Sequence, residues 1–334
     1  MNTGAMGDLA RSYAMQSRNN GLKQEMERLA AELTSGRVAD MRKAAQGNAA
    51  YVNDLERSLK KLDGYDVAAR EATQFADGVQ TALGRFGDLN MAFRDTALRS
   101  GNTPFGQTSN LIFSDAQQTL DDMISTLNTN VAGRSLFAGA ATDTAAFAPA
   151  TDMLGALGAV MAGAGSVDDM LAAAENWFND PAGFNSVVYR GSNTALAPMT
   201  LSDNETVQFD LRGNDPVIRD TLRNMALLAI ADDPALNLTA AQKSEIFEKT
   251  VGKVIAASDS IVALRAETGL SESRLEAQSS RNSAERASLE MARSNLLSID
   301  PFKAATELEQ VQFQLQSLYA ITSRMSQLSL LNFI

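Results

Sequence analysis

The stretch PFKAATELEQVQFQLQSLYAITSRMSQLSLLNFI, residues 301–334, decides the fold. Apolar side chains recur in it at alternating steps of four and three residues, which is the heptad pattern of a coiled-coil helix. The stripe consists of Ala304, Leu308, Val311, Leu315, Leu318 and Met325, with Thr322 in register. Because such a stripe is buried against another helix, the stretch predicts a helix that needs a partner.

A partner stripe lies at the opposite end of the chain. It consists of Met15, Leu22, Met26, Leu29 and Leu33, with Asn19 at the skipped position. The TSGR run at 34–37 predicts the end of this helix, because Gly36 suits a C-cap. Two stripes about 250 residues apart pack most economically as an antiparallel coiled coil, which brings the two ends of the chain together.

Helical patterns also fill most of the interval between these ends. They are found at 52–62, from about 66, at 111–131, at about 215–231 and at about 239–268. A turn-rich break separates two of them at 100–106. Asp300 and Pro301 predict the start of the last helix, as its N-cap and its first helical residue.

The middle of the chain differs in character. From GRSLFAGA, residues 133–140, charge falls, and short β-prone runs follow at 187–189 and 207–211. The predicted fold is mainly α, a long antiparallel coiled-coil or helical-bundle rod with a smaller inserted α+β domain. The predicted parts are a terminal coiled-coil assembly domain (1–45 with 290–334), a helical rod domain (46–140 with 251–289) and an outer domain (141–250).

Composition excludes several classes of function. The chain has 40 acidic and 29 basic residues, a net charge of −11, which argues against nucleic acid as a main partner. Residues 140–250 alone hold 15 acidic and 6 basic residues. Because the chain has no histidine and no cysteine, it has no imidazole base, thiol nucleophile or disulfide. No secretory signal peptide and no apolar run of about 18 residues is found, so we expect no membrane span.

No catalytic constellation is recognised. The glycine turn at 163–166 lacks the Lys-Ser/Thr of a phosphate-binding loop, and the acid pairs at 168–169 and 232–233 read as helix-start or loop charges. Trp177 reads as a core residue of the inserted domain. We therefore expect no enzymatic activity, no cofactor and no metal.

Three runs carry a resemblance to a known family. AELTSGRV (31–38) and DPFKAATELEQVQFQLQSLYAITSRMSQLSLL (300–331) resemble the first and last helices of the flagellin family of axial proteins. GRSLFAGA (133–140) is similar, more narrowly, to the Gly-Arg-x-Leu-Phe-x-Gly run of the hook–filament junction proteins, the third hook-associated proteins. The Leu-Leu-Asp-Gly run typical of flagellin is absent, which favours the junction proteins.

The resemblance implies an extracellular structural protein of the bacterial flagellum. Such a protein is exported unfolded by the flagellar type III apparatus without a cleaved signal. It assembles as a ring of copies of itself between a neighbouring hook-associated protein and flagellin, after binding an export chaperone, with neither nucleic acid nor membrane as a partner. Flagellin itself is the nearest alternative, a cytoplasmic coiled-coil scaffold is the next, and an enzyme built on the inserted domain is the most distant.

The expected assembly interface is formed by both terminal helices. It consists of Leu22, Met26, Leu29, Leu33, Leu308, Val311, Leu315, Leu318, Tyr319, Met325, Leu328, Leu330, Leu331, Phe333 and Ile334. For Leu315, Leu318 and Met325 the main expected role is the internal coiled coil. For residues 330–334 the main expected partners are neighbouring subunits, because an apolar end has few partners within its own chain.

Overall fold

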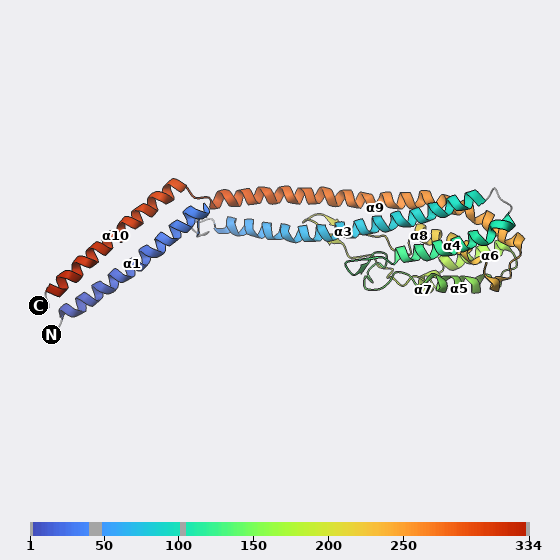
Figure 1. Ribbon diagram of the computed structural model, residues 1–334, viewed down its shortest axis with the longest axis horizontal. Helices are drawn as coiled ribbons and strands as arrows, with labels where there is room; N and C mark the ends of the chain where they lie inside the picture. Colours follow the sequence, from blue (N-terminus) through green and yellow to red (C-terminus); the bar gives the residue numbers. More distant parts are fainter. Residues whose placement is uncertain (1–2, 40–48, 101–104, 332–334) are drawn as a thin grey trace. The chain divides into compact units, whose positions relative to one another are not determined.

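The computed structural model describes the backbone of residues 3–39, 49–100 and 105–331. The fold is mainly helical with four very short strands among these residues, which confirms the predicted fold class. The chain divides into two compact units (Figure 1). Unit 1 comprises Met1–Asp63 with Ser283–Ile334, and unit 2 comprises Gly64–Asn282.

Unit 1 is built from the two ends of the chain. Helix α1 (Thr3–Ser35) packs against α10 (Pro301–Leu331), and the beginning of α3 (Ala49–Ser100) and the end of α9 (Ala240–Leu297) complete the unit. In Figure 1 the beginning of α1 lies beside the end of α10, so the two helices run antiparallel, as the two stripes predict.

Helix α3 is one continuous helix where the sequence indicated two. Its buried side chains recur at steps of three or four residues, with the half-buried Asp66 at the one skipped position, at Val52, Leu55, Leu59, Leu62, Ala69, Ala72, Ala76, Val79, Leu83, Phe86, Asn90, Phe93 and Ala97. The separate helix expected from about Asp66 is therefore wrong. The alanines of this stripe carry the period past Asp66, and Gly64 has open space around it, so nothing forces the helix to break there.

In unit 2, α3 packs antiparallel against α9. The Gln80 side-chain amide donates to the Arg265 carbonyl at 2.8 Å, and the buried Asn90 amide donates to the Val254 carbonyl at 3.0 Å. The later residue of α3, Asn90, contacts the earlier residue of α9, Val254, so the two helices run antiparallel. A buried asparagine in a two-helix seam fixes the register, because a shift leaves its amide unpaired.

The rest of unit 2 is a helical cluster around α8. The elements are α4 (Phe105–Leu127), α5 (Ala150–Met161), α6 (Val167–Asn179), α7 (Phe184–Val187), α8 (Pro216–Ile230) and a 3-10 turn (Pro234–Leu236). Residues 221–230 of α8 are buried on every side, and α8 packs against α4, α5 and α6. One apolar cluster runs from Ala69 to Leu275 and includes these helices, so the predicted domain limits at 140 and 251 cross a continuous core. The predicted three-part division stays a prediction.

The strands are shorter than the sequence indicated. They form two antiparallel hairpins, β1 (Asn130–Val131) with β2 (Arg134–Ser135) and β3 (Met199–Thr200) with β4 (Thr206–Val207). The run expected at 207–211 is a strand only at Val207.

The run expected at 187–189 is not a strand. Val187 ends α7, Val188 follows it, and Tyr189 forms a single bridge with Phe147. Val188 and Tyr189 are buried, so their β-prone side chains serve the core of an irregular segment.

The GRSLFAGA run joins several backbone segments of unit 2. Gly139 adopts φ +59°, and a Cβ there would lie 2.6 Å from the carbonyl oxygens of both Ser192 and Thr194. The Gly213 N–H donates to the Phe137 carbonyl at 2.8 Å. Only glycine permits both the left-handed conformation and this approach, which gives the run a structural role.

Candidate assembly interface

The α1–α10 pair of unit 1 contains the residues that the sequence nominated as an interface. Leu29 is 2% exposed and Leu315 is 9% exposed. Five further stripe residues are half-buried, namely Leu22, Met26, Leu308, Val311 and Leu318. These side chains are at least partly covered by the chain itself, as expected for an internal coiled coil.

The remaining nominated residues are placed differently. Leu33 and Tyr319 are exposed, with 36% and 46% of their surface accessible. The side chains of Met325, Leu328, Leu330 and Leu331 lie outside the described residues, as do Phe333 and Ile334 entirely. Their role at an interface stays a prediction.

A second apolar feature of α10 was missed by the sequence analysis. Phe302 is 83% exposed and Phe313 is 70% exposed. They are eleven residues apart, about three helical turns, so they share one face of α10. At 100° per residue that face lies opposite Ala304 and Leu315.

The signal for this second face was present in the sequence. Two phenylalanines interrupt the polar side of the helix, although they lie outside the heptad stripe that predicted the coiled coil. Tyr13 of α1 and Ile321 of α10 are also 75% and 51% exposed. Large apolar side chains that a chain leaves uncovered make this part of α10 a candidate for contact with a partner.

The segment that follows α1 is joined to the end of α9 and to the α9–α10 connection by backbone hydrogen bonds. The Val38 N–H donates to the Leu297 carbonyl at 2.8 Å, and the Ile299 N–H donates to the Gly36 carbonyl at 3.2 Å. Gly36 adopts φ +69° directly after α1, which confirms the predicted helix stop. These two hydrogen bonds fix where the pairing of the two terminal helices begins.

Charged side chains also stabilise the end of α1. Glu32 is buried, and its Oε1 accepts from Arg28 at 2.7 Å and from the Ala39 N–H at 2.9 Å. Arg28 also donates to Glu25. Hydrogen bonds to the carboxylates of Glu25 and Glu32 raise the pKa of Arg28 above its ordinary value, so this cation stays charged in the pair.

The start of α10 has the predicted cap. Asp300 Oδ1 accepts from the Phe302 N–H at 3.0 Å and from the Lys303 N–H at 3.2 Å, with Pro301 as the first helical residue. A carboxylate at this place satisfies free N–H groups and the helix dipole together. The cap therefore fixes the start of α10. The exposed Phe302 follows directly and is the first residue of the face opposite Ala304 and Leu315.

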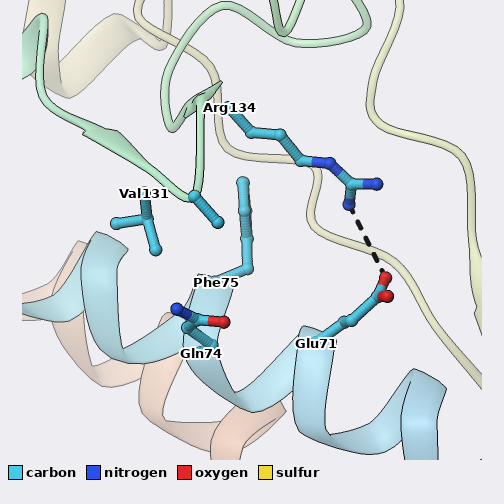
Figure 2. Close-up of a pocket in the computed structure, with 6 residues that line it drawn as sticks. Glu71, Gln74, Phe75, Val131 and Arg134 are labelled. Carbon is cyan, nitrogen blue, oxygen red and sulfur yellow. Dashed lines mark ion pairs between the residues drawn. The ribbon is translucent and has the colours of Figure 1, made fainter.

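Unit 2 offers a shallow pocket of about 300 Å³ where the β1–β2 hairpin covers α3 (Figure 2). Arg134 reaches Glu71 at 3.8 Å across it, and Val131 lies beside Phe75. A Cβ on Gly78 would lie 2.8 Å from Val131 Cγ2, so this glycine lets the hairpin approach the helix. The pocket holds one exposed ion pair and no arrangement for chemistry.

The acid pairs have the structural roles expected of them. Asp168 and Asp169 lie in the first turn of α6, and Asp233 caps the 3-10 turn. Among the residues whose positions are described, no three carboxylates converge as a metal site. Within the same residues, no helix is long and apolar enough to cross a membrane.

Comparison with known protein families gives two matches. The bacterial flagellin N-terminal helical region matches residues 8–142, and the bacterial flagellin C-terminal helical region matches residues 251–334. Together they cover about two thirds of the chain. No curated protein matches the chain.

Solved structures with the same fold include three flagellar proteins. A flagellar hook-associated protein from Vibrio parahaemolyticus is 13% identical, with a TM-score of 0.50 over 73% of this chain and 95% of that one. FlgL from Bacillus cereus is 13% identical and FlgL from Xanthomonas campestris 14% identical, each with a TM-score of 0.51 over 72% of this chain and 99% of the other.

Proposed function

Because the chain belongs to the flagellin family of bacterial axial proteins, we propose that it is a hook-associated protein that joins the hook to the filament. Members of this family are structural proteins of the flagellum, which lies outside the cell, and they associate with themselves and with other flagellar proteins. The junction role is the finer proposal. It draws on the shared fold with FlgL proteins and on the GRSLFAGA run.

The observation that carries the proposal is that α10 has apolar side chains on two opposite faces. One face packs against α1 through residues such as Leu315, while the opposite face leaves Phe302 and Phe313 uncovered. Each of these rings, once buried, contributes roughly 1.5–3 kcal/mol before ordering costs are subtracted. Repeated around a ring of subunits, such contacts are sufficient to drive assembly.

The proposed mechanism is mechanical. The paired terminal helices are buried between subunits and connect one helical lattice to the next, while residues 141–250 face solvent. In the free subunit the ends are labile, because their outer faces lack cover and ordering is completed on assembly. During export a chaperone covers the apolar C-terminal helix. We propose no enzymatic activity and no cofactor for this chain.

A truncation after Ser326 tests the proposal. It removes Leu328, Leu330, Leu331, Phe333 and Ile334. We expect the truncated protein to be exported but not to assemble, with the melting temperature of the monomer unchanged. Motility of a strain that lacks the native gene, complemented with each variant, reports assembly, and Ser329→Ala serves as the matched control. A large fall in melting temperature, or normal assembly without the tail, contradicts the assignment.

Two further outcomes separate the alternatives. Flagellin extends into long filaments unaided, so purified full-length protein that forms filaments in negative-stain microscopy favours a filament subunit. A cytoplasmic scaffold stays inside the cell and has helical, protease-resistant ends as a free protein. We expect neither outcome. Limited proteolysis of the monomer should instead remove roughly the first 30–45 and the last 30–40 residues, because uncovered ends open locally.

A further inference from the structure

The β3–β4 hairpin of unit 2 contacts both long helices of that unit. The Tyr65 hydroxyl of α3 donates to Asp203 Oδ1 at 2.7 Å. The Asn282 side-chain amide of α9 donates to the Leu201 carbonyl at 2.9 Å. Both acceptors lie in the five-residue connection between the two strands, so one short turn holds one hydrogen bond to each helix.

The α9 side of this contact is pre-organised. The Gln278 side-chain amide donates to Asn282 Oδ1 at 2.7 Å, and Arg281 donates to Gln278 Oε1 at 2.6 Å. Gln278 and Asn282 are only 6% and 4% exposed, and Leu201 is 1% exposed. A buried amide relay of this kind has one favourable geometry, because any other leaves polar atoms unpaired.

Apolar contacts continue the attachment beyond β4. The ring centroids of Phe209 and Phe75 are 5.0 Å apart with the planes tilted by 51°, and Val207 is buried. The segment from Met199 to Phe209 is therefore fixed to α3 at two places and to α9 at one. Figure 1 shows the hairpin lying against these two helices, away from α4 to α8.

The attachment lies beside a part of α3 that buries only small side chains. Between Leu62 and Phe75 the buried residues of α3 are Ala69 and Ala72, whereas farther along the helix they include Phe86 and Phe93. Burial of a methyl group stabilises far less than burial of a phenyl ring, so the alanine part of the seam contributes little on its own. Tyr65 and Asn282 also lie at the two limits of unit 2.

We propose that the β3–β4 hairpin is a clasp that keeps α3 and α9 paired at this end of unit 2. While the hairpin is seated, both helices are held by one turn. When it leaves, Tyr65 and Asn282 are released together, and the alanine part of the seam opens as a unit. The clasp thus decides how far the ordered helix pair extends in the free subunit.

Backbone hydrogen exchange of the full-length protein tests the clasp. The variant Tyr65→Phe with Asn282→Ala removes both hydrogen bonds, and we expect exchange at 65–75 of α3 and 275–282 of α9 to rise by roughly tenfold or more. The control Gln80→Ala removes an α3–α9 hydrogen bond in which the hairpin has no part. In both proteins exchange within α4 and α8 should be unchanged.

A cross-link gives an independent measurement. Because the chain has no cysteine, Tyr65→Cys with Asp203→Cys supplies the only two thiols, which a short bismaleimide can join. Joining them should lower exchange at 65–75 relative to the same protein before cross-linking. The clasp is refuted if the hydrogen-bond variant leaves exchange at both helices unchanged, if exchange rises equally throughout unit 2, or if the cross-link has no effect.

Discussion

The two units place phenylalanine in opposite environments. In unit 2 the ten phenylalanines whose side chains are described are all buried, with exposures of 8% or less, whereas Phe302 and Phe313 of unit 1 are 83% and 70% exposed. Unit 2 therefore covers its described phenylalanine rings within one chain, whereas unit 1 leaves two of its own uncovered. This difference is what we expect if the exposed rings of unit 1 meet other molecules, as proposed above.

Sequence pattern alone does not separate the two units, because both use heptad stripes. The difference arises from what covers the side of each helix that faces away from its partner helix. In unit 2 the far side of α3 and α9 receives the α4–α8 cluster and both hairpins, whereas in unit 1 the described residues contain nothing comparable to cover α10. Each of the following changes should affect one unit far more than the other.

The largest effect is expected from removal of residues 141–250, with Ala140 joined to Val251 by a short flexible linker. This deletion takes away α8, which packs against α4, the helix that carries the buried Phe113 and Leu120. We expect unit 2 to lose its cooperative thermal unfolding, measured by circular dichroism, because a large part of its core is gone. A sharp transition at the original temperature would show that the deleted region is separable.

Single truncations of aromatic rings should reproduce the contrast on a smaller scale. Phe86→Ala in unit 2 should lower the free energy of unfolding by about 3–5 kcal/mol, because the ring is fully buried. Phe313→Ala in unit 1 should change it by less than about 0.5 kcal/mol while it impairs assembly. Chemical denaturation of the two monomers measures the difference. Equal losses of stability would mean that α10 is covered within its own chain.

Glycine-to-alanine changes test how closely each region is packed. Gly21 of α1 has no atom within 4 Å of an added Cβ, so Gly21→Ala should stabilise the helix by roughly 0.5–1 kcal/mol. Gly78→Ala in α3 brings a Cβ to 2.8 Å from Val131 and should destabilise unit 2 by about 1–3 kcal/mol. Gly78→Ala should lower the melting temperature of the monomer, whereas Gly21→Ala should raise its helix content, measured by circular dichroism, without lowering the melting temperature. A lowered melting temperature for both variants contradicts this account.

The smallest effect concerns a carboxylate of unit 2. Burial raises the pKa of Asp215 above its ordinary value of 3.8, the Val217 N–H opposes this, and Glu267 adds to it. Because the folded state then binds the proton more readily, ionisation of Asp215 destabilises the fold as pH rises through its folded pKa. Asp215→Asn keeps the cap on α8 and should increase stability at neutral pH.

The pH dependence of that gain is the decisive observation. The gain should shrink as pH falls through the raised pKa and disappear below 3.8, where the carboxyl is protonated in both states. Denaturation of Asp215→Asn across this pH range measures it, and the exposed Asp143→Asn serves as the control. A gain that persists unchanged at acid pH would exclude ionisation as its cause.

The helical part of the fold could be predicted because its signals are periodic and local. The stripes of 15–33 and 304–325, the stop at Gly36 and the cap at Asp300 each follow from steric or hydrogen-bonding rules within a few residues. The continuity of α3 through Gly64 was missed because alanines carry its stripe. A small side chain that is buried only in the folded molecule gives little signal in the sequence.

The middle of unit 2 and the second face of α10 could not be read in the same way. Residues 185–213 combine β-prone side chains with turns, but tertiary burial of Val188 and Tyr189 outweighed strand propensity. Phe302 and Phe313 can be read in the sequence, but the exposure of their side chains depends on which surfaces the rest of the chain covers. The assembly residues from Met325 to Ile334 remain a prediction from pattern alone.

The helix-to-helix contacts of the chain are nested. Asn90 pairs with Val254, Gln80 with Arg265, Asp63 with Arg286 and Arg37 with Ser298, over separations of 164, 185, 223 and 261 residues. Formed independently, such high-contact-order pairings are slow, but here each contact leaves only about 20 to 40 residues of loop for the next to close. One slow search at the innermost contact is followed by rapid zippering towards the chain ends. On this kinetic order α1 and α10 pair last and, under any pull on the termini, separate first.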